Sequence, residues 1–484
     1  MVIGAGASGL ASAAILAANG YSVTLVERAP AEGPVLRGFS RGGTYFDTGF
    51  HYSGGLAPGG VLDRLLRYLG VVDRLNLVAF NAAAFDRYRE GGSGFEFAFP
   101  TGLDAVRSAL CDAFPAQNVA VHSYLDKLAQ SCATFPYLNP ELDIDAFLGT
   151  PTAHDPSLAE VLDGLTEDRQ LKRVLSLHTL LHGVPPDEVP FRYHAAAAGL
   201  YYHSVHTVRG GGRALVDAFV ARLEELGVRR ITNRAVAAIE SDASGEVAGV
   251  RLEDGETLPC DVCVSTIHPK LLLALVPEGA FRRVYRRRIA ALEETTSAHL
   301  LFLHCDGELP ILDHSNLIFV PNGDAPELRG IHYLNRSKGS GEQSHQNGIV
   351  LIKPARFADT PGGNAPALSA RPDGYCEGKQ TVARTLLEAA EQTCPELAGR
   401  LTPVTSASPL TVRDYCGSPE GGLYGVKHRV GQYNPLPATR MRGLFLAGQA
   451  IGGAGVLGAV LSAFLCCGHI LGHGTLQRGV RSCN

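Results

Sequence analysis

The sequence predicts an α/β protein in which a domain built on a parallel sheet is interleaved with a second, mixed α+β domain. Two observations lead to this prediction. A strand, a glycine turn, a helix and a second strand follow one another within residues 1–28, and a strand followed by an apolar, glycine-opened helix closes the chain at residues 443–471. The length of 484 residues fits two or three domains at about 150 residues each.

The N-terminal segment has the composition of a βαβ unit. Residues 1–3 are apolar and end at a glycine turn over 4–9, which is followed by an Ala- and Leu-rich helix over 10–19. Residues 21–26 predict a second strand, and this strand ends at Glu27.

The glycine turn carries the spacing G-x-G-x-x-G, formed by Gly4, Gly6 and Gly9. The first glycine permits a tight turn, the second lets the backbone approach a pyrophosphate, and the third lets the helix pack closely on the strand. Glu27, 18 positions after Gly9, is placed to accept both hydroxyls of an adenosine ribose. The motif predicts a dinucleotide-binding site, but it does not separate NAD from FAD.

The middle of the chain alternates between glycine-rich turns and mostly helical segments. Glycine-rich turns at 33–43 and 54–60 precede a mixed, mostly helical stretch over 62–202. The motif Arg209-Gly-Gly-Gly-Arg213 then introduces a helix predicted over 214–226.

Strand-like runs come next, followed by a second mixed block, so we predict two interleaved domains. The runs cover 236–240, 247–253 and 257–265, and the mixed block covers 276–436. The dinucleotide-binding domain is expected to comprise residues 1–75, 205–275 and 437–484. The substrate-binding domain is expected to comprise residues 76–204 and 276–436.

The composition excludes several classes of protein. A chain with 45% hydrophobic and 19% charged residues is not disordered throughout. The net charge of −5 gives no basic field, so no nucleic-acid partner is expected. Eleven irregularly spaced cysteines indicate reduced thiols and a cytoplasmic protein. Cys260 and Cys263 form a C-x-x-C without a second ligand pair, so they are interpreted as structural and no metal is expected.

Membrane contact is expected to be peripheral at most. No Lys or Arg precedes Arg28, so a signal peptide lacks its basic segment. The uncharged stretch 443–477 contains nine glycines, and its longest apolar piece, 456–471, is shorter than the roughly 20 residues of a span. The basic run Arg282–Arg288 is either a solvated helix face or a contact with anionic lipid.

Blocks from one end of the chain to the other resemble the phytoene desaturase, carotenoid isomerase and retinol saturase family of FAD-dependent oxidoreductases. The residues 46–52 and the glutamine at 449 look most like the retinol saturase branch. The blocks that carry the resemblance are Val2–Leu10, Val26–Arg28, Tyr45–Tyr52, Arg209–Arg213, Ser408–Thr411, Gly422–Gly425, Gly443–Gln449 and Gly455–Leu461.

The resemblance implies a Rossmann-like FAD-binding domain and assigns its contacts residue by residue. The glycine turn, with Gly4, Gly6, Ala7, Ser8 and Gly9, would hold the pyrophosphate. The remaining implied contacts are Glu27 on the adenosine ribose, Arg28 beside the adenosine, Arg37 on the flavin side of the phosphates, Gly49 in the turn next to the flavin, Val236 at the adenine, Gly448 and Gln449 along the ribityl chain, and Gly455, Val456 and Leu457 at the flavin pyrimidine. Two positions depart from the family: Pro34 replaces a glycine, and Gln449 stands where many members have an acid.

The catalytic group is less visible in the sequence than the cofactor site. His51 and Tyr52 follow the turn at 47–49 and are the first candidates for proton transfer beside the flavin. Tyr424 and His428 are the second candidates. The pairs His178 and His182, and His203 and His206, are interpreted as polar or substrate-lining residues rather than metal ligands.

The resemblance implies chemistry at carbon–carbon double bonds of a hydrophobic isoprenoid or polyene: saturation, desaturation or isomerisation. The branch favours saturation. Two other functions stay open. A flavin amine oxidase shares the fold, but the chain has no Trp for the aromatic cage that such an enzyme usually needs. A GDP-dissociation-inhibitor-like protein keeps the fold without flavin, and the intact glycine turn argues against it.

Overall fold

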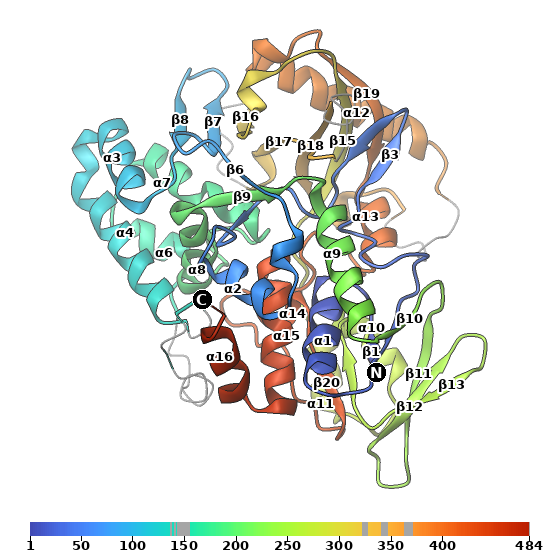
Figure 1. The fold of residues 1–484 in the computed structure, drawn as a ribbon. Helices are drawn as coiled ribbons and strands as arrows, with labels where there is room; N and C mark the ends of the chain where they lie inside the picture. Colours follow the sequence, from blue (N-terminus) through green and yellow to red (C-terminus); the bar gives the residue numbers. More distant parts are fainter. Residues whose placement is uncertain are drawn as a thin grey trace.

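The computed structural model describes residues 1–484 apart from 136–137, 140–141, 143–154, 322–327, 340–346, 363–370 and 484. A five-stranded parallel sheet of order β10-β2-β1-β14-β20 forms the centre of one half of the molecule (Figure 1). Its strands are β1 (Val2–Ile3), β2 (Thr24–Val26), β10 (Arg229–Ile231), β14 (Cys263–Ser265) and β20 (Leu444–Leu446). The chain order reverses at β1, and ligands of such sheets bind at the carboxyl end of that switch point.

Three helices cover one face of the parallel sheet: α1 (Ala7–Ala18), α9 (Gly211–Glu225) and α15 (Gly455–Leu471). Their apolar sides share one core with Val2 and Val264 of the strands. The first ten residues of α1 are all buried, and their small Ala, Gly and Ser side chains let α1 pack closely against both α9 and α15. This arrangement confirms the predicted α/β class with a Rossmann-like parallel sheet.

A three-stranded antiparallel sheet of order β11-β12-β13 covers the opposite face. Ile3 and Val26 point into this second core, because successive side chains of a strand alternate between faces. The bounds are β11 (Val236–Ser241), β12 (Val247–Leu252) and β13 (Thr257–Pro259).

The prediction of one strand over 257–265 is wrong, because the chain forms β13 and β14 in two different sheets. Pro259 ends β13, since proline has no amide hydrogen to donate to a ladder. The chain then turns and joins the parallel sheet beside β1.

A seven-stranded mixed sheet of order β19-β15-β18-β17-β16-β7-β8 organises the other half of the molecule. Neighbours are antiparallel except β7 and β16. The strands are β7 (Asp86–Glu90), β8 (Glu96–Phe99), β15 (Ser297–Cys305), β16 (Asn316–Val320), β17 (His332–Arg336), β18 (Gly348–Ala355) and β19 (Leu401–Ala407). Helix α12 (Tyr375–Thr393) packs on it through Leu386 and Ala390.

A layer of helices packs beside β7 and β8 and shares an apolar core with them. These helices are α3 (Leu103–Ala113), α4 (Asn118–Ala133), α6 (Leu158–Asp163), α7 (Arg169–Ser176) and α8 (Phe191–His203). A small sheet of order β5-β9-β6 lies where the two halves meet, with strands Ser53–Gly54, Val205–Val208 and Leu77–Ala79. The remaining elements are β3 (Phe39–Arg41), β4 (Thr44–Phe46), α2 (Val61–Tyr68), α10 (Pro269–Leu275), α11 (Arg283–Ala290), α13 (Pro409–Cys416), α14 (Gln449–Gly452) and α16 (His473–Arg481).

The parallel sheet draws its strands from the N-terminal, central and C-terminal parts of the chain, and the mixed sheet draws its strands from the two intervening parts. The domain boundaries given above stay a prediction. No helix in the described part of the chain combines the length and the apolar character needed to cross a membrane.

Candidate functional site

The glycine turn lies at the carboxyl end of β1 and is open on one side. Gly4 has a φ of +95°, and a side chain at Gly9 would meet the Gly4 carbonyl oxygen at 1.8 Å, so both positions require glycine. Gly6 differs, because no atom lies within 4 Å of the place where its Cβ would be. Gly6 is exposed although Ala5 and Ala7 on either side of it are buried. The turn therefore borders free space directly above the Gly6 backbone.

Two helix N-termini face this region. Gly6 is the N-cap of α1, which no side chain caps, and Ala454 is the N-cap of α15, where the Gln449 side chain accepts the Gly455 amide hydrogen. Ser8 and Ser462 hold the two helices together through a hydroxyl–hydroxyl hydrogen bond of 2.8 Å, and Ser462 also accepts the Gly448 amide hydrogen. Uncapped amides and two positive dipole ends next to free space fit a pyrophosphate. The residues present therefore fit FAD.

Glu27 is buried at the end of β2 and has a fixed carboxylate. Its Oε2 accepts the Ala5 amide hydrogen at 2.7 Å, and its Oε1 accepts the Ala29 amide hydrogen at 2.8 Å. The backbone of Arg234 reaches the Glu27 carbonyl, which brings the start of β11 at Val236 close to the same point. Each carboxylate oxygen keeps a lone pair for a ribose hydroxyl.

We expect Glu27→Ala to weaken FAD binding by tenfold or more. Loss of charged hydrogen bonds to the ribose, at roughly 1.5–3 kcal/mol each before compensation by water, gives this magnitude. Titration of the apoprotein with FAD measures the effect, and Glu253→Ala, at an exposed strand end, is the matched control. An unchanged dissociation constant would refute the role of Glu27.

Of the two arginines assigned to the cofactor, Arg37 has protein partners. The Arg37 guanidinium donates to Asp217 at 2.7 Å and to the Glu32 carbonyl at 2.6 Å, so it joins the 33–37 loop to α9. The Arg28 guanidinium extends toward Gly417. Gly49 packs against Val35, where a Cβ would lie 2.7 Å from the Val35 carbonyl oxygen.

His51 and Tyr52 lie in a cluster of aromatic rings between the two halves of the molecule. The Tyr52 ring is 5.4 Å from Phe80, 5.0 Å from Tyr201 and 6.1 Å from Tyr333, and the His51 ring is 6.0 Å from Tyr333. Burial raises the pKa of the Tyr52 phenol well above 10 and lowers the pKa of His51, so both are neutral at pH 7. His51, Tyr52 and Tyr201 are only partly buried, so each keeps some accessible surface beside this cluster.

Tyr424 and His428 line the same region from the C-terminal side. The His428 ring stacks on Tyr193 at 4.7 Å and donates from Nε2 to the Gln449 carbonyl at 2.8 Å. The Tyr193 hydroxyl accepts the Ala454 amide hydrogen at 2.8 Å. With its amide nitrogen facing the Tyr424 carbonyl, the Gln449 side chain donates there at 3.2 Å and accepts from Gly455 at 3.1 Å. Gln449 thus ties the start of α15, with Val456 and Leu457, to this wall.

The loop that carries Tyr424 is anchored by the buried carboxylate of Glu294. Its Oε2 accepts from the Ser418 hydroxyl at 2.5 Å and from the amides of Glu420 and Gly422 at 2.9 and 3.2 Å. Its Oε1 faces His268 Nε2 at 3.4 Å. Burial raises the pKa of Glu294, and the three donors to Oε2 oppose that rise.

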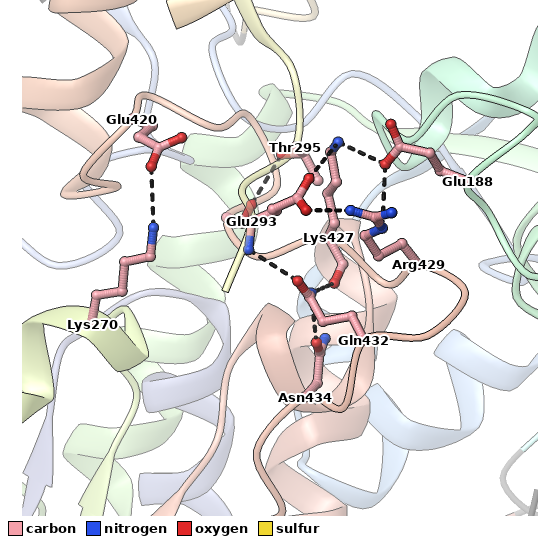
Figure 2. Close-up of polar contacts among 10 residues, drawn as sticks. Glu188, Lys270, Glu293, Thr295, Glu420, Lys427, Arg429, Gln432 and Asn434 are labelled. Carbon is pink, nitrogen blue, oxygen red and sulfur yellow. Dashed lines mark hydrogen bonds and ion pairs between the residues drawn. The ribbon is translucent and has the colours of Figure 1, made fainter. Parts of the chain in front are cut away.

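A ring of charges on the outer side fixes the segment around His428 (Figure 2). Lys427 contacts Glu188 at 2.7 Å and Glu293 at 3.4 Å, and Arg429 pairs with the same two carboxylates. Gln432 accepts the Glu293 amide hydrogen and donates to the Lys427 carbonyl. These contacts join the segments at residues 188, 293 and 427–432, and they hold His428, which lies between Lys427 and Arg429, against Tyr193.

Lys338 also faces this region, and no sequence motif had singled it out. Its amide donates to Asp47 Oδ2 at 2.7 Å and its carbonyl accepts the Gly210 amide hydrogen, so its backbone is clamped between the 47–49 turn and the 209–213 motif. Its ammonium lies 5.5 Å above the Phe80 ring. Burial lowers the pKa of Lys338 to about 8.

We expect Lys338→Met to stabilise the protein at pH 7 and less so at higher pH. The folded protein buries an ammonium whose pKa falls from 10.5 to about 8, so between these values the unfolded chain binds more protons than the folded protein. Wild-type stability therefore rises relative to the variant across this window. Thermal unfolding at pH 7 and pH 9.5 measures the difference, with exposed Lys127→Met as control. If the difference in stability between the variant and the wild type did not change with pH, the protein would not bury a charged Lys338 ammonium.

The histidine pairs lie in different surroundings. His178 and His182 are buried in the helical layer, whereas His203 is exposed at the end of α8 and His206 lies on β9. Among the residues that the structure describes, no group of three or more His, Cys, Asp or Glu side chains is arranged to hold a metal ion. Cys260 and Cys263 are both free thiols.

The fold and the open glycine turn define a dinucleotide-binding protein. The family model described as flavin containing amine oxidoreductase matches residues 7–471. The chain therefore belongs to this family; it is a flavin-dependent oxidoreductase, and its cofactor is FAD.

Relatives and solved structures agree with this assignment. The chain is 25% identical over 524 residues to the human all-trans-retinol 13,14-reductase, covering 97% of this chain and 85% of that protein. It is 24% identical to a 4,4'-diapophytoene desaturase of Staphylococcus aureus, over 63% of this chain and 62% of that protein. These relatives confirm the resemblance to the retinol saturase and carotenoid desaturase branch.

The solved structures support the fold alone. An oxidoreductase from Methanosarcina mazei superimposes with a TM-score of 0.67 at 18% identity, covering 96% of this chain and 98% of that one. A putrescine oxidase bound to putrescine superimposes with a TM-score of 0.62 at 15% identity, covering 99% and 97%.

Proposed function

We propose that this enzyme uses FAD to add or remove hydrogen at a carbon–carbon double bond of a hydrophobic isoprenoid or polyene, with saturation as the favoured direction. The observation that carries the proposal is the cluster of aromatic rings formed by Tyr52, Tyr201 and Tyr333, in which Tyr52 and Tyr201 keep accessible surface. An extended apolar chain gains free energy by leaving water for such surroundings. The similarity to a retinol reductase over nearly the whole chain supports the same substrate class.

The chain's own residues divide the work around FAD as follows. Gly4, Gly6 and Gly9 with the start of α1 would hold the pyrophosphate, and Glu27 the adenosine ribose. When bound, FAD supplies or accepts a hydride. His51 lies beside the aromatic cluster and is neutral at pH 7, so it is placed to accept a proton from the substrate when hydrogen is removed. In the saturating direction it would first take up a proton and then deliver it to the second carbon of the double bond. The aromatic rings exclude water from the reacting carbons.

A second candidate function is oxidation of an amine. Tyrosine rings surround the site: Tyr52, Tyr201, Tyr333 and Tyr424. The faces of tyrosine rings attract a cationic amine, so a cage of tyrosines can bind an amine even though the chain has no tryptophan. The family description points in the same direction. For this function the oxidised enzyme must take electrons from the amine.

Anaerobic spectroscopy separates the two functions. The photoreduced enzyme is mixed with a panel of polyenes, and the oxidised enzyme is mixed with a panel of primary and secondary amines. We expect a polyene to restore the oxidised flavin spectrum of the photoreduced enzyme. We expect no amine to bleach the flavin of the oxidised enzyme. Bleaching by an amine, with no reoxidation by any polyene, would establish the second function instead.

We also propose that helix α11 contacts an anionic membrane surface. Arg282, Arg283, Arg287 and Arg288 are exposed, and Val284 on the same helix is an exposed apolar side chain. Arg286, in the same basic run, is only partly exposed, and its guanidinium donates to the Leu273 carbonyl at 2.9 Å. An exposed apolar side chain among arginines fits a lipid headgroup region.

Co-sedimentation with anionic vesicles tests this surface. At about 1 kcal/mol per arginine, four arginines give reversible binding that salt weakens. Replacing the four exposed arginines by Gln is expected to abolish pelleting at low salt. Lys379→Gln with Arg384→Gln on α12, at the far end of the molecule, is the control and should pellet normally. Equal pelleting of both variants would show that α11 is only a solvated face.

A further inference from the structure

Lys338 carries an ammonium group that has no acidic partner. Among the residues that the structure describes, no carboxylate oxygen lies within 4.0 Å of its Nζ, and Nζ forms no hydrogen bond with them. The side chain is only partly buried, so it keeps accessible surface. A charge in partly buried surroundings costs free energy unless a group of opposite sign contacts it. Lys338 therefore has both the charge and the access to bind an anion.

The two acids whose charges act on Lys338 are held by other groups. The Asp47 carboxylate accepts from the Tyr45 hydroxyl at 3.0 Å and from the backbone amide of Lys338 at 2.7 Å. Asp313 faces the Arg336 guanidinium at 3.7 Å. Neither carboxylate comes within ion-pair distance of the ammonium, so its positive charge stays available.

Arg209 is a second cation beside Lys338. The Gly210 amide donates to the Lys338 carbonyl at 2.6 Å, so the two segments lie side by side. Arg209 is exposed, and its guanidinium forms no ion pair or hydrogen bond within the described part of the chain. Two cations on adjoining segments, neither with an acidic partner, make this region positively charged.

His314 adds a third basic side chain. Its carbonyl accepts an amide hydrogen at 2.7 Å from the residue that follows Phe80, the ring above which the Lys338 ammonium lies. Burial lowers the pKa of His314, and the positive charges of Lys338 and Arg209 lower it further against the opposing charge of the adjacent carboxylate. The three basic groups thus lie close enough to act on one another, and an anion among them would be attracted by all three.

The Lys338 ammonium stands at one end of a row of aromatic rings. It lies 5.5 Å above the Phe80 ring, and Phe80 stacks on Tyr52 with 5.4 Å between the ring centres. Tyr52 in turn stacks on Tyr333 at 6.1 Å. These rings belong to the aromatic cluster that supports the proposed function. An extended apolar chain that lies along them would bring one of its ends to the ammonium.

We propose that Lys338, with Arg209 and His314 beside it, binds an anionic end group of the substrate, so that the substrate is an isoprenoid or polyene that ends in a carboxylate or a phosphate. Hydrogen bonds from an ammonium to either group are charge-assisted and are stronger than those to a hydroxyl. One fixed polar contact at the end of an apolar site also sets the position of the chain along the rings.

The same charges oppose a cationic amine, because like charges repel in partly buried surroundings. The inference thus separates the proposed function from amine oxidation. It rests on the proposed function for the isoprenoid chain, whereas the preference for an anion can be measured without any turnover.

The test is calorimetric titration of the oxidised, FAD-loaded protein with one saturated isoprenoid chain that carries three different end groups. The chain is supplied as the carboxylic acid, the phosphate monoester and the primary alcohol, and it contains no double bond to reduce. We expect at least one of the two anions to bind tenfold or more tightly than the alcohol. The tighter of the two anions identifies the end group. An alcohol that binds as tightly as both anions would overturn the proposal.

Substitutions assign the preference to Lys338. Lys338→Met should fold, because it removes a partly buried charge, and it should bind the anion and the alcohol with similar affinity. Lys338→Arg should keep most of the preference, and Arg209→Gln should lower it by less than Lys338→Met does. Lys127→Met, at an exposed position of α4, is the matched control and should bind like the wild type.

Two results with Lys338→Met would overturn the proposal. One is a preference for the anion that stays tenfold, because another group would then bind the end group. The other is an equal loss of affinity for the anion and the alcohol, because Lys338 would then only support the structure of the site. Failure of the proposed function is recognised separately, since an enzyme that reduces no polyene can still show the preference for an anion.

Discussion

Gly6→Val is expected to give a folded protein that purifies without FAD. Gly6 has no atom within 4 Å of its Cβ position and an extended backbone, so the protein itself accommodates a larger side chain. The space that valine would fill is the space that the pyrophosphate needs, and the steric conflict removes contacts with the α1 N-terminus. The absorbance ratio of flavin to protein measures the effect, and circular dichroism measures the fold.

A matched glycine distinguishes cofactor loss from general damage. Gly279 is exposed, has no atom near its Cβ position and no positive φ, and lies far from the turn in sequence. Gly279→Val should retain FAD fully. Gly9→Ala is the opposite case: its Cβ would meet the Gly4 carbonyl at 1.8 Å, so the fold should suffer together with binding. A yellow Gly6→Val protein with a full complement of FAD would show that the turn does not hold the cofactor.

Glu294→Ala is expected to destabilise the protein by about 3 kcal/mol and to release the loop that carries Tyr424. The substitution leaves three donors without an acceptor, the Ser418 hydroxyl and the amides of Glu420 and Gly422. Each unsatisfied buried donor costs roughly 1 kcal/mol or more. Denaturant unfolding measures the change in the free energy of unfolding.

Glu420→Ala is the control for this loop. Its carboxylate is exposed and pairs with Lys270 at 3.2 Å, and the alanine keeps the backbone amide that Glu294 accepts (Figure 2). The expected change is below 1 kcal/mol, as for other surface pairs. Similar losses in the two variants would mean that Glu294 contributes no more than a surface charge.

The sequence was sufficient for those parts of the fold that depend on local patterns. Residues 1–28 place a glycine turn between two short strands and a helix, and the structure has α1 and β2 there because small residues and apolar runs allow few alternatives. The strand over 257–265 was predicted wrongly, because Pro259 and Asp261 interrupt the β-prone run and the chain changes sheets between β13 and β14.

The site was harder to predict than the fold because its residues come from distant segments. His51 and Tyr52 follow a recognisable turn, whereas Asp86, beneath Tyr52, stands in a strand whose pattern gives no sign of a buried carboxylate. Lys338 is one lysine in a polar loop, and its burial depends on Asp47 and Gly210, which hold it from two other segments. Such couplings exist only in three dimensions.

Mass analysis of a single turnover tests the central claim most directly. The anaerobic photoreduced enzyme is mixed with one equivalent of the polyene that reoxidises it fastest. The reaction is run in H2O and in D2O, and the mass of the product is measured by mass spectrometry. The account predicts a gain of two hydrogens in H2O, one from the flavin and one from a proton donor of the site, and two deuteriums in D2O, where both positions exchange. A product of unchanged mass, or a reduced enzyme that no polyene reoxidises, would contradict saturation of a carbon–carbon double bond as its reaction.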